Sequence, residues 1–406
     1  MRAFSFSLLV LTGSCSLLLS GSEPTEDASP PEIDGAPNPS CSCTSQAPYC
    51  GSDGTCYAEC VDLPPTEQGL VCRADTPARP LCERRGCVEC VAHEDCLEEG
   101  EVCDVIAGTC RGFSNLFVVD RNKAGTACTF SDPCATIEAA VDVVRLLQNG
   151  TAATIAVFPG VYVNEVIGMS GLDIRMLAHG AALEGESRIE IRNDGKLVVE
   201  GFRFNASPPM ALAEPLSCAT GAELTLKEVT IENSDLRAAN VETCVKLTIE
   251  RSVVRDNASG LRVFDTEIDI SNSLFAENNG LGATPAAVTF LSMVTGRFVL
   301  NTVSGNASAV DGNANGVRCV GTLGTFAGNA VGDTVDSSCP FTNSVVTGGI
   351  GDGVIPEDPM LDANHRPMAQ SPGNNQSSIE SLVGSGDRDL GLVPRNSPPD
   401  MGAYEF

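Results

Sequence analysis

The sequence predicts an all-β solenoid of stacked coils, closed by a helix at its N-terminal end and preceded by a small disulfide-rich module. Three observations lead to this fold class. A β-rich unit recurs between residues 197 and 329, one amphipathic segment lies at residues 131–150, and residues 41–110 hold 12 of the 19 cysteines. Hairpin signals are scarce in the repeated region, which favours parallel stacking of coils over an antiparallel meander.

The composition of the 406-residue chain limits its partners. The formal net charge of -28 would repel nucleic acid and an anionic membrane surface, so we predict neither as a partner. The chain has no Trp and only 4 Tyr, so the aromatic platforms on which sugars and bases usually stack are scarce. These properties suit a soluble surface protein, and we expect it to be a monomer.

The N-terminus predicts export. Residues 1–21 contain one early Arg, an apolar run and then small residues, which is typical of a signal peptide. "LTGSC", which ends at Cys15, resembles a bacterial lipobox, and this resemblance implies a lipid on Cys15 as the only membrane contact. The alternative is an ordinary signal peptide cleaved after Gly21 or Ser22. Residues 22–40 are acidic and rich in Pro, so we expect an extended tether.

Residues 41–111 form a cysteine-rich module with an internal repeat. "PYCGSDGTCYAECV" from Pro48 aligns with "PLCERRGCVECV" from Pro80. Units this short bury too little surface for a core, so we expect disulfides to stabilise them by roughly 2–4 kcal/mol each. "CVEC" has the spacing of half a zinc site, but an oxidising compartment disfavours that alternative. The module resembles small cysteine-rich repeats of surface proteins from Gram-negative bacteria with large genomes, which implies spacing, display or partner binding.

Residues 112–345 are predicted to be the solenoid with its helical cap. The segment "SDPCATIEAAVDVVRLLQNG" has a helix start at Ser131 or Asp132, Pro133 in the first turn and a stop at Gly150. Its predicted apolar face consists of Ile137, Ala140, Val141, Val144 and Leu147. With the following "TIAVFPGVYVNEV", it resembles the entry of many bacterial β-helix proteins, in which "TIEAAV" and "PGVY" recur. We expect the helix to cover the otherwise open first coil.

The repeated unit consists of two alternating apolar pairs followed by a turn that contains Asn. The successive copies end at Asn205, Asn233, Asn257, Asn278, Asn306 and Asn329. A period in the low to mid twenties, with two strands per unit, indicates stacked coils, about eight in number. Asn tolerates left-handed backbone angles, so we interpret these residues as turn formers and not as catalytic groups.

This pattern resembles the right-handed parallel β-helix proteins of the pectate-lyase-like class. A leucine-rich-repeat solenoid is disfavoured because the units lack a helix and a fixed leucine signature. The cysteine spacing supports coil stacking independently, because cysteines about one coil apart can be bridged between neighbouring coils. The expected disulfides, the first of them local, are Cys128–Cys134, Cys218–Cys244 and Cys319–Cys339.

Residues 346–406 are predicted to cover the last coils. Three motifs occur in order: "DPMLDANHRPMAQSPGN" from Asp358, "DRDLGLVPR" from Asp387 and "PDMGAYEF" from Pro399. They resemble the tail of bacterial surface proteins that carry a choice-of-anchor Q domain, although the family's usual "SPAID" reads "SPGNN" here. The resemblance implies an extracellular or cell-envelope location and implies no enzymatic activity.

Because the β-helix class includes polysaccharide lyases and hydrolases, carboxylates on successive coils are candidate catalytic groups. Asp256 and Glu277 occupy comparable points near the turns, as Glu232 does on the coil before them. Arg255 is a candidate base beside them. The simpler interpretation makes all four solvated residues on the outside of the coils.

Other residues offer weaker candidates. Asp387 and Asp389 could ligate calcium, although a turn is the simpler interpretation of "GDRDLGLVPR". His93, His179 and His365 are scattered in the sequence, and we expect each to be an isolated surface or loop residue.

The sequence therefore favours a non-catalytic exported protein, extracellular or on the outer cell surface. In that role it displays a rigid β-helix for adhesion or for contact with a glycan or another partner, and no cofactor is required. The alternative is a secreted polysaccharide lyase or hydrolase that acts along the β-helix face, and a lyase would need Ca²⁺. In either case the expected partner is a polysaccharide or another cell-surface molecule.

Overall fold

The computed structural model describes residues 49–50, 56–57, 81–83, 86–96, 100–104, 107–147, 151–206, 214–280, 287–308, 315–349, 353–373, 389–390 and 400–404. The expected signal peptide with Cys15, the tether of residues 22–40 and Asp387 lie outside these ranges, so the statements about them stay predictions. Within the described ranges, no helix is long and apolar enough to cross a membrane.

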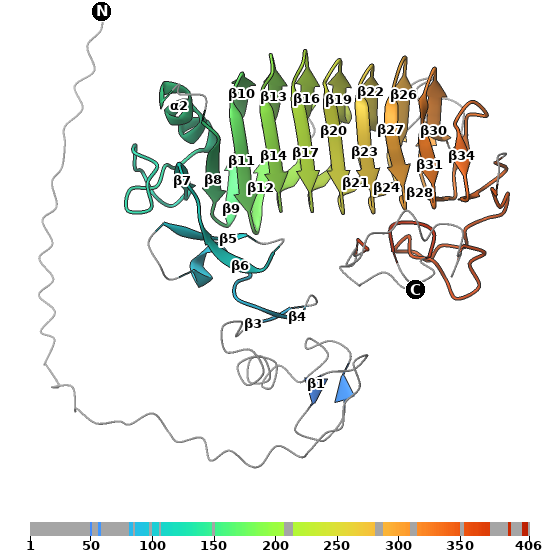
Figure 1. Ribbon diagram of the computed structural model, residues 1–406, viewed down its shortest axis with the longest axis horizontal. Helices are drawn as coiled ribbons and strands as arrows, with labels where there is room; N and C mark the ends of the chain where they lie inside the picture. The colour runs from blue at the N-terminus through green and yellow to red at the C-terminus, as the bar shows by residue number, and fades with distance from the viewer. Residues whose placement is uncertain are drawn as a thin grey trace, which may run out of the picture.

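The main body is a parallel β-helix, in which successive coils add one strand to each of three parallel sheets (Figure 1). The ten-stranded sheet consists of β7 (Leu116–Val119), β8 (Ala153–Val157), β11 (Asp173–Ala178), β14 (Lys196–Glu200), β17 (Glu223–Lys227), β20 (Lys246–Glu250), β23 (Glu267–Ser271), β27 (Thr295–Val299), β31 (Leu323–Ala327) and β34 (Phe341–Thr342). The predicted all-β solenoid is confirmed.

The other two sheets complete the coils. The nine-stranded sheet consists of β9 (Gly160–Val163), β12 (Ala181–Glu184), β15 (Arg203–Asn205), β18 (Thr230–Glu232), β21 (Val253–Arg255), β24 (Leu274–Ala276), β28 (Thr302–Ser304), β32 (Ala330–Val331) and β35 (Val345–Val346). The eight-stranded sheet consists of β10 (Val166–Ser170), β13 (Arg188–Arg192), β16 (Leu216–Ala219), β19 (Arg237–Glu242), β22 (Ser259–Phe264), β26 (Val288–Leu291), β30 (Asn315–Val320) and β33 (Thr334–Val335).

The remaining elements are short. The cysteine-rich module contains three antiparallel pairs and a 3₁₀ turn: β1 (Tyr49–Cys50) with β2 (Cys56–Tyr57), β3 (Leu81–Glu83) with β4 (Gly86–Val88), β5 (Glu101–Asp104) with β6 (Thr109–Gly112), and η2 (His93–Asp95). The β-helix adds α2 (Ile137–Leu147) and a parallel pair of β25 (Asn279–Gly280) with β29 (Ala307–Ser308).

The prediction of two strands per unit is wrong, because each full coil has three. The missed strands form the eight-stranded sheet and follow closely after the turns, as in β19 and β22. Only Ala239 and Val241 provide the buried alternation of β19, between polar neighbours such as Asn240. So weak a pattern resembles a loop in the sequence. The predicted coil length is confirmed, since turn hydrogen bonds join residues 21 to 28 positions apart.

Inward side chains of the three sheets fill a continuous core. Leu224 and Leu247 pair on neighbouring strands of the ten-stranded sheet, and both are buried. Towards the C-terminal coils the core becomes aromatic, and Phe290, Phe298 and Phe326 pack with ring centroids 5.2 to 5.7 Å apart. Burying each such side chain contributes about 1.5–3 kcal/mol, so stacking the coils is itself the main source of stability.

Ladders of buried asparagines run along the turns. The Oδ1 of Asn278 accepts the backbone N–H and the side-chain Nδ2–H of Asn257 at 3.3 and 3.0 Å. Asn306 accepts the same two groups of Asn278 at 3.0 and 2.9 Å. At another corner, the Oδ1 of Asn329 accepts the backbone N–H of Asn301 at 3.0 Å. An amide both donates and accepts, so each Asn links its own coil to the next.

These ladders correct the interpretation of the asparagines as left-handed turn formers. Of the six predicted residues, only Asn233 has a left-handed backbone, with φ of 60°. In the following two coils the left-handed residue stands just before the Asn: Asp256 and then Glu277, each with φ of 54°. The prediction that Asn306 and Asn329 end equivalent turns is wrong, because Asn329 lies at a different corner of the coil. The buried asparagines at positions 257, 278, 306 and 329 serve hydrogen bonds between coils, whereas the exposed Asn233 keeps the predicted turn role.

Helix α2 begins later than predicted. Thr136, and not Ser131 or Asp132, caps the helix, because its Oγ1 accepts the backbone N–H of Ala139 at 3.2 Å. Asp132 instead accepts two backbone N–H groups in the loop before the helix, at 3.0 and 3.1 Å. Pro133 likewise precedes the helix, inside the loop that a disulfide closes.

The apolar face of α2 covers the first coils, where the helix contacts β7, β8 and β10 (Figure 1). The predicted face is confirmed for its first four members, which are buried: Ile137, Ala140, Val141 and Val144. Leu147 was wrongly included, because its side chain is 52% exposed. All of residues 145–147 are exposed, so the apolar contact with the sheets ends one turn before the helix does, and only the Arg145 side chain reaches back, to the carbonyl of Gly168 in β10 at 2.7 Å.

Five disulfides lie in the described part of the chain. Three join the pairs expected from the spacing: Cys128–Cys134, Cys218–Cys244 and Cys319–Cys339. The last two connect neighbouring coils, with Cα–Cα distances of 6.1 and 5.0 Å. The coil spacing of about 4.8 Å makes such bridges possible without moving the backbone.

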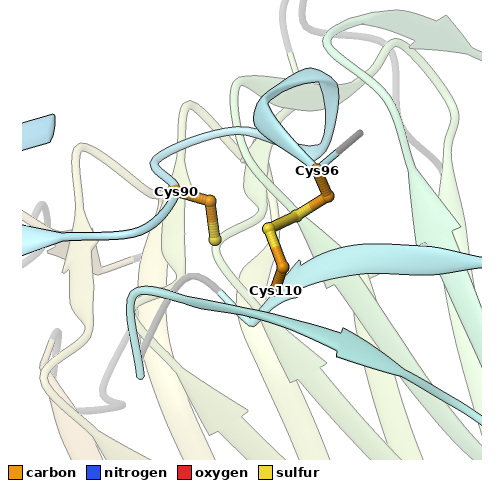
Figure 2. Close-up of side chains that lie close together, drawn as sticks. All are labelled: Cys90, Cys96 and Cys110. Atoms are coloured by element: carbon orange, nitrogen blue, oxygen red, sulfur yellow. A yellow bond between two sulfur atoms is a disulfide. The ribbon is translucent and has the colours of Figure 1, made fainter. Parts of the chain in front are cut away.

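The other two disulfides belong to the second copy of the cysteine repeat, and they are Cys90–Cys103 and Cys96–Cys110. Figure 2 shows the Cys90 side chain beside the Cys96–Cys110 bridge, and the sulfur atoms of these three residues lie within 4.8 Å of one another. The zinc alternative for "CVEC" is wrong at Cys90, because its sulfur is bonded to Cys103.

The second cysteine repeat packs on the ten-stranded sheet. Val102 of β5 joins Leu177 of β11 in a buried apolar cluster, and Arg175 pairs with Asp104 at 3.3 Å. His93, expected to be an isolated surface or loop residue, is 0% exposed, and its Nε2 lies 3.2 Å from the carbonyl oxygen of Leu177. This part of the module is therefore fixed to the β-helix by apolar, polar and charged contacts.

Candidate functional site

A cavity of about 540 Å³ lies between the nine-stranded sheet and the C-terminal segment, defined here as the described part of residues 353–404. This segment is the orange to red chain beside the ends of β24 and β28 in Figure 1. The volume falls within the range of about 300–1,000 Å³ that is typical of ligand sites. The lining residues are Thr230, Val253, Arg255, Leu274 and Glu277 from the coils, and Ala363, Asn364, His365, Arg366 and Tyr404 from the segment.

One outward position, repeated on three successive coils, forms the floor of the cavity. Thr230 of β18 pairs with Val253 of β21, which pairs with Leu274 of β24. Because alternate residues of a strand point to opposite faces, these side chains face the cavity, while Ile231 and Val254 fill the core. The floor is mostly apolar and rises by about 4.8 Å per coil.

Glu232 is the most deeply buried charge beside this floor, with 2% of its surface exposed. Arg255 donates to its Oε2 from Nη2 at 2.9 Å and from Nε at 3.1 Å, and Arg203 donates to its other oxygen. The interpretation of Glu232 as a solvated residue is therefore wrong. Because an Arg side chain stays protonated in proteins, Arg255 is suited to hold ligand oxygens and unsuited to accept a proton.

Asp256 and Glu277 follow each other on neighbouring coils at the left-handed turn position. Their side chains are 42% and 53% exposed, so the interpretation of these two as outward residues is confirmed. Partial burial, and then repulsion by Glu277, raise the pKa of Asp256. Two neighbouring carboxyl groups, one of them with a raised pKa, are an arrangement that hydrolases use, so this pair carries the enzymatic alternative.

The C-terminal segment forms the opposite wall. The Nδ1 of His365 lies 3.0 Å from the Oγ of Ser304, and its Nε2 lies 3.8 Å from the Oε1 of Glu277. Arg366 lies over the ring of Tyr404, with its Cζ 5.1 Å from the ring centroid. Burial raises the pKa of Tyr404, so its hydroxyl stays protonated at neutral pH and is able to donate a hydrogen bond.

An aspartate turn presents this wall. The Oδ1 of Asp362 accepts the backbone N–H groups of Asn364 and Arg366 at 2.8 and 2.9 Å. The backbone N–H of Arg366 also holds the pKa of Asp362 below its usual range. The expectation that His365 is an isolated residue is wrong, because the turn places it against the coils. The run "DANHRP", an Asp turn followed by three polar side chains, was the signal that could have located this wall.

The described residues do not fit a calcium site. Asp256 and Glu277 offer carboxylates from two residues only, whereas Ca²⁺ takes 6–8 oxygen ligands. In the described part of the chain, the one cluster of three or more potential metal ligands consists of cysteines, and disulfides occupy their sulfurs. Asp389 is buried near Tyr404, whose pKa it helps to raise, and its proposed partner Asp387 lies outside the described residues.

Sugar rings have the features that this cavity complements. Their C–H faces are apolar, and their hydroxyl groups pair with planar polar groups. The floor of Thr230, Val253 and Leu274 offers an apolar surface, and guanidinium, carboxylate, imidazole and amide groups surround it. The arrangement is suited to bind a saccharide through several hydrogen bonds at once.

Sequence comparison finds no relative, since no protein-family model and no curated protein matches the chain. Among solved structures, pectate lyase Pel9A is similar at 12% identity and a TM-score of 0.38, over 72% of this chain and 97% of that chain. PfbA, a surface adhesin of Streptococcus pneumoniae, is similar at 11% identity and a TM-score of 0.31, over 59% of this chain and 81% of that chain. Neither likeness carries information about the activity of this chain.

Proposed function

We propose that this protein is a non-catalytic, exported surface protein whose β-helix binds a saccharide in the cavity between the nine-stranded sheet and the C-terminal segment. The observation that carries the proposal is the composition of the cavity, a small apolar floor within a mainly polar lining of planar hydrogen-bonding groups. Export rests on the predicted signal peptide and is supported by the disulfides, which are typical of an oxidising compartment. A lipid on Cys15 and the tail that resembles the choice-of-anchor Q domain would keep the protein at the cell envelope.

The surroundings of Arg255 support a binding role over catalysis. Its guanidinium is paired with the buried Glu232, which holds the side chain in place. A lyase would need a base and a calcium ion, but Arg255 is unsuited to accept a proton, and Asp256 and Glu277 offer too few oxygen ligands for calcium. A fixed guanidinium suits recognition, because little side-chain entropy is lost when a ligand binds.

The net charge indicates which saccharides to test first. A chain with a formal charge of -28 repels polyanions, so neutral saccharides are favoured over polyuronates. We therefore expect neutral glycans to bind more tightly than uronate chains at low salt, and the difference to shrink as salt screens the repulsion.

Glu277→Gln tests the proposed site. The change removes one cavity carboxylate at nearly constant size, so affinity for a bound neutral saccharide is expected to fall about tenfold. Glu267→Gln on the ten-stranded sheet is the matched control, because both glutamate side chains are 53% exposed and each lies within 4 Å of a basic side chain. Titration calorimetry over a panel of neutral glycans measures the effect. Equal affinity of the two variants would place the ligand elsewhere, and silence across the panel would refute saccharide binding.

A hydrolase is the second candidate, favoured by the raised pKa of Asp256 beside Glu277. It predicts product release from the same panel, independent of Ca²⁺, and loss of that release in Asp256→Asn. The binding proposal predicts that the saccharide is recovered intact after prolonged incubation, with EDTA or with Ca²⁺. If the natural protein releases product and the Asp256→Asn variant does not, the binding proposal is wrong and the hydrolase replaces it.

A further inference from the structure

The floor of the cavity belongs to a longer track along the nine-stranded sheet. The same outward position continues from Arg203 through Thr230, Val253 and Leu274 to Thr302, one residue per coil. Since the coils rise by about 4.8 Å each, the track offers a regular surface along the long axis of the β-helix. An extended chain molecule is the ligand shape that fits such a track.

The track is closed at its C-terminal end. Thr302 is 0% exposed, and its Oγ1 accepts the backbone N–H of Ala403 at 2.9 Å. The chain approaches so closely there that a Cβ on Gly402 would stand 2.8 Å from the same oxygen. Two residues after Thr302 on the same strand, Ser304 is hydrogen-bonded to His365. The C-terminal segment therefore lies directly on the strand β28 and ends the track after β24.

The opposite end of the track is exposed. The Arg203 side chain is 56% exposed, although it pairs with Glu232. Two coils further towards the N-terminus the same outward position is occupied by Val161, which pairs with Ala182 as Ala182 pairs with Arg203, and both are half-buried. Exposure on the track is thus lowest at β28 and highest at Arg203 of β15. Within the described residues, the C-terminal segment stops a chain on the track at His365, and the side chain of Arg203 leaves the other direction open to solvent.

We propose that the cavity recognises the end of a saccharide chain, whose terminal unit meets the wall formed by His365 and its neighbours while the rest runs along the track. This inference rests on the proposed saccharide binding and adds the part of the ligand that is recognised. A chain interior cannot occupy the cavity, because the C-terminal segment blocks its continuation over β28.

Binding to size fractions of one polysaccharide tests this inference. Partial hydrolysis of a neutral β-glucan and of a neutral mannan yields fractions that differ in mean chain length but not in composition. At equal mass, recognition of ends predicts that bound protein increases in proportion to the number of chain ends, so halving the mean length doubles the binding. Bound protein that stays constant per unit mass would overturn end recognition and leave saccharide binding intact. Absence of binding to every fraction would overturn both.

A variant of the wall provides a second readout. His365→Ala removes a side chain that faces the chain end, and we expect about tenfold weaker binding of short glucan or mannan oligomers. His179→Ala, at an exposed histidine far from the cavity in the sequence, is the control and is expected to change nothing. Should His365→Ala lower the melting temperature, the exposed Asn364→Ala variant takes its place. Unchanged affinity in a folded wall variant contradicts the inference.

Discussion

Single buried polar residues hold the separate parts of this molecule together. His93 joins the cysteine-rich module to the β-helix through the carbonyl of Leu177, and Glu232 joins three coils through two arginines. Neither role is visible in the sequence, because the partners lie far away along the chain or on other coils. Burial decides these roles, and burial is a property of the assembled fold.

His93 is expected to make stability depend on pH. Burial lowers its pKa to about 4, so the folded protein keeps the imidazole neutral in a range where the unfolded chain protonates it. Stability is therefore complete above the unfolded pKa of about 6.5 and falls as pH drops towards 4, by roughly 2 kcal/mol at pH 5 relative to pH 7.

His93→Phe is expected to remove this loss, since Phe fills the space beside Phe158 and does not titrate. Denaturant unfolding of both proteins at pH 7 and pH 5 measures the difference. A variant that loses as much stability on acidification as the natural protein would show that His93 is not the responsible group.

At the candidate site, sequence reasoning located one side only. It singled out Arg255, Asp256 and Glu277, because carboxylates and a guanidinium recur at comparable points of a regular repeat. His365 and Tyr404 escaped it, because a local turn such as that of Asp362 does not indicate which part of the chain it packs against, and the partner of His365, Ser304, lies 61 residues back. In a repeated unit, the period of the sequence indicates which residues become neighbours. The C-terminal segment is not repeated, so no period indicates where it packs.

At the level of elements, the turns carry much of the specificity of stacking. Asn278 is 0% exposed, receives two hydrogen bonds from Asn257 and gives two to Asn306, and it also donates to the carbonyl of Val254 at 3.0 Å. Hydrophobic stacking alone would allow neighbouring coils to slip, but these amides bond in only one register.

Asn278→Ala is expected to lower the free energy of unfolding by roughly 3 kcal/mol, because it leaves buried groups of Asn257 without an acceptor. Asn233→Ala is the comparison, since that residue is exposed and loses its tolerance of a left-handed backbone and one exposed hydrogen bond to Asn205, together about 1 kcal/mol. Urea unfolding of the two variants measures both losses. Equal losses would mean that the ladder contributes no more than a turn residue does.

Elements with a strong local pattern were the ones that sequence reasoning placed well. Helix α2 was predicted from its apolar spacing, and the strands of two sheets from their alternation. The start of the helix was misplaced, because Thr136 lies in a stretch with several residues able to cap and only the disulfide loop decides among them. The third strand of each coil was missed because the predicted unit ended at the turn that precedes it, although inward pairs such as Ile189 and Ile191 of β13 alternate clearly.

At the scale of the whole molecule, a parallel β-helix is predictable because each coil repeats the same solution to burial and hydrogen bonding. The regular spacing of apolar pairs and cysteines in the sequence indicates this repeated arrangement. The docking of the second cysteine repeat and the closing of the track by residues 401–404 are long-range contacts between non-repeated segments. The contact of the C-terminal segment forms one wall of the cavity beside the nine-stranded sheet, and which residues meet there is visible only in the structure.

The most direct test of the account is a crystal structure of the intact exported chain with the tightest-binding neutral oligosaccharide. We predict an unbroken oligosaccharide whose terminal unit lies on Thr230, Val253 and Leu274, against His365, with the remaining units pointing towards Arg203. A saccharide bound on another face, a chain that crosses the cavity from side to side, or a cleaved product would contradict it.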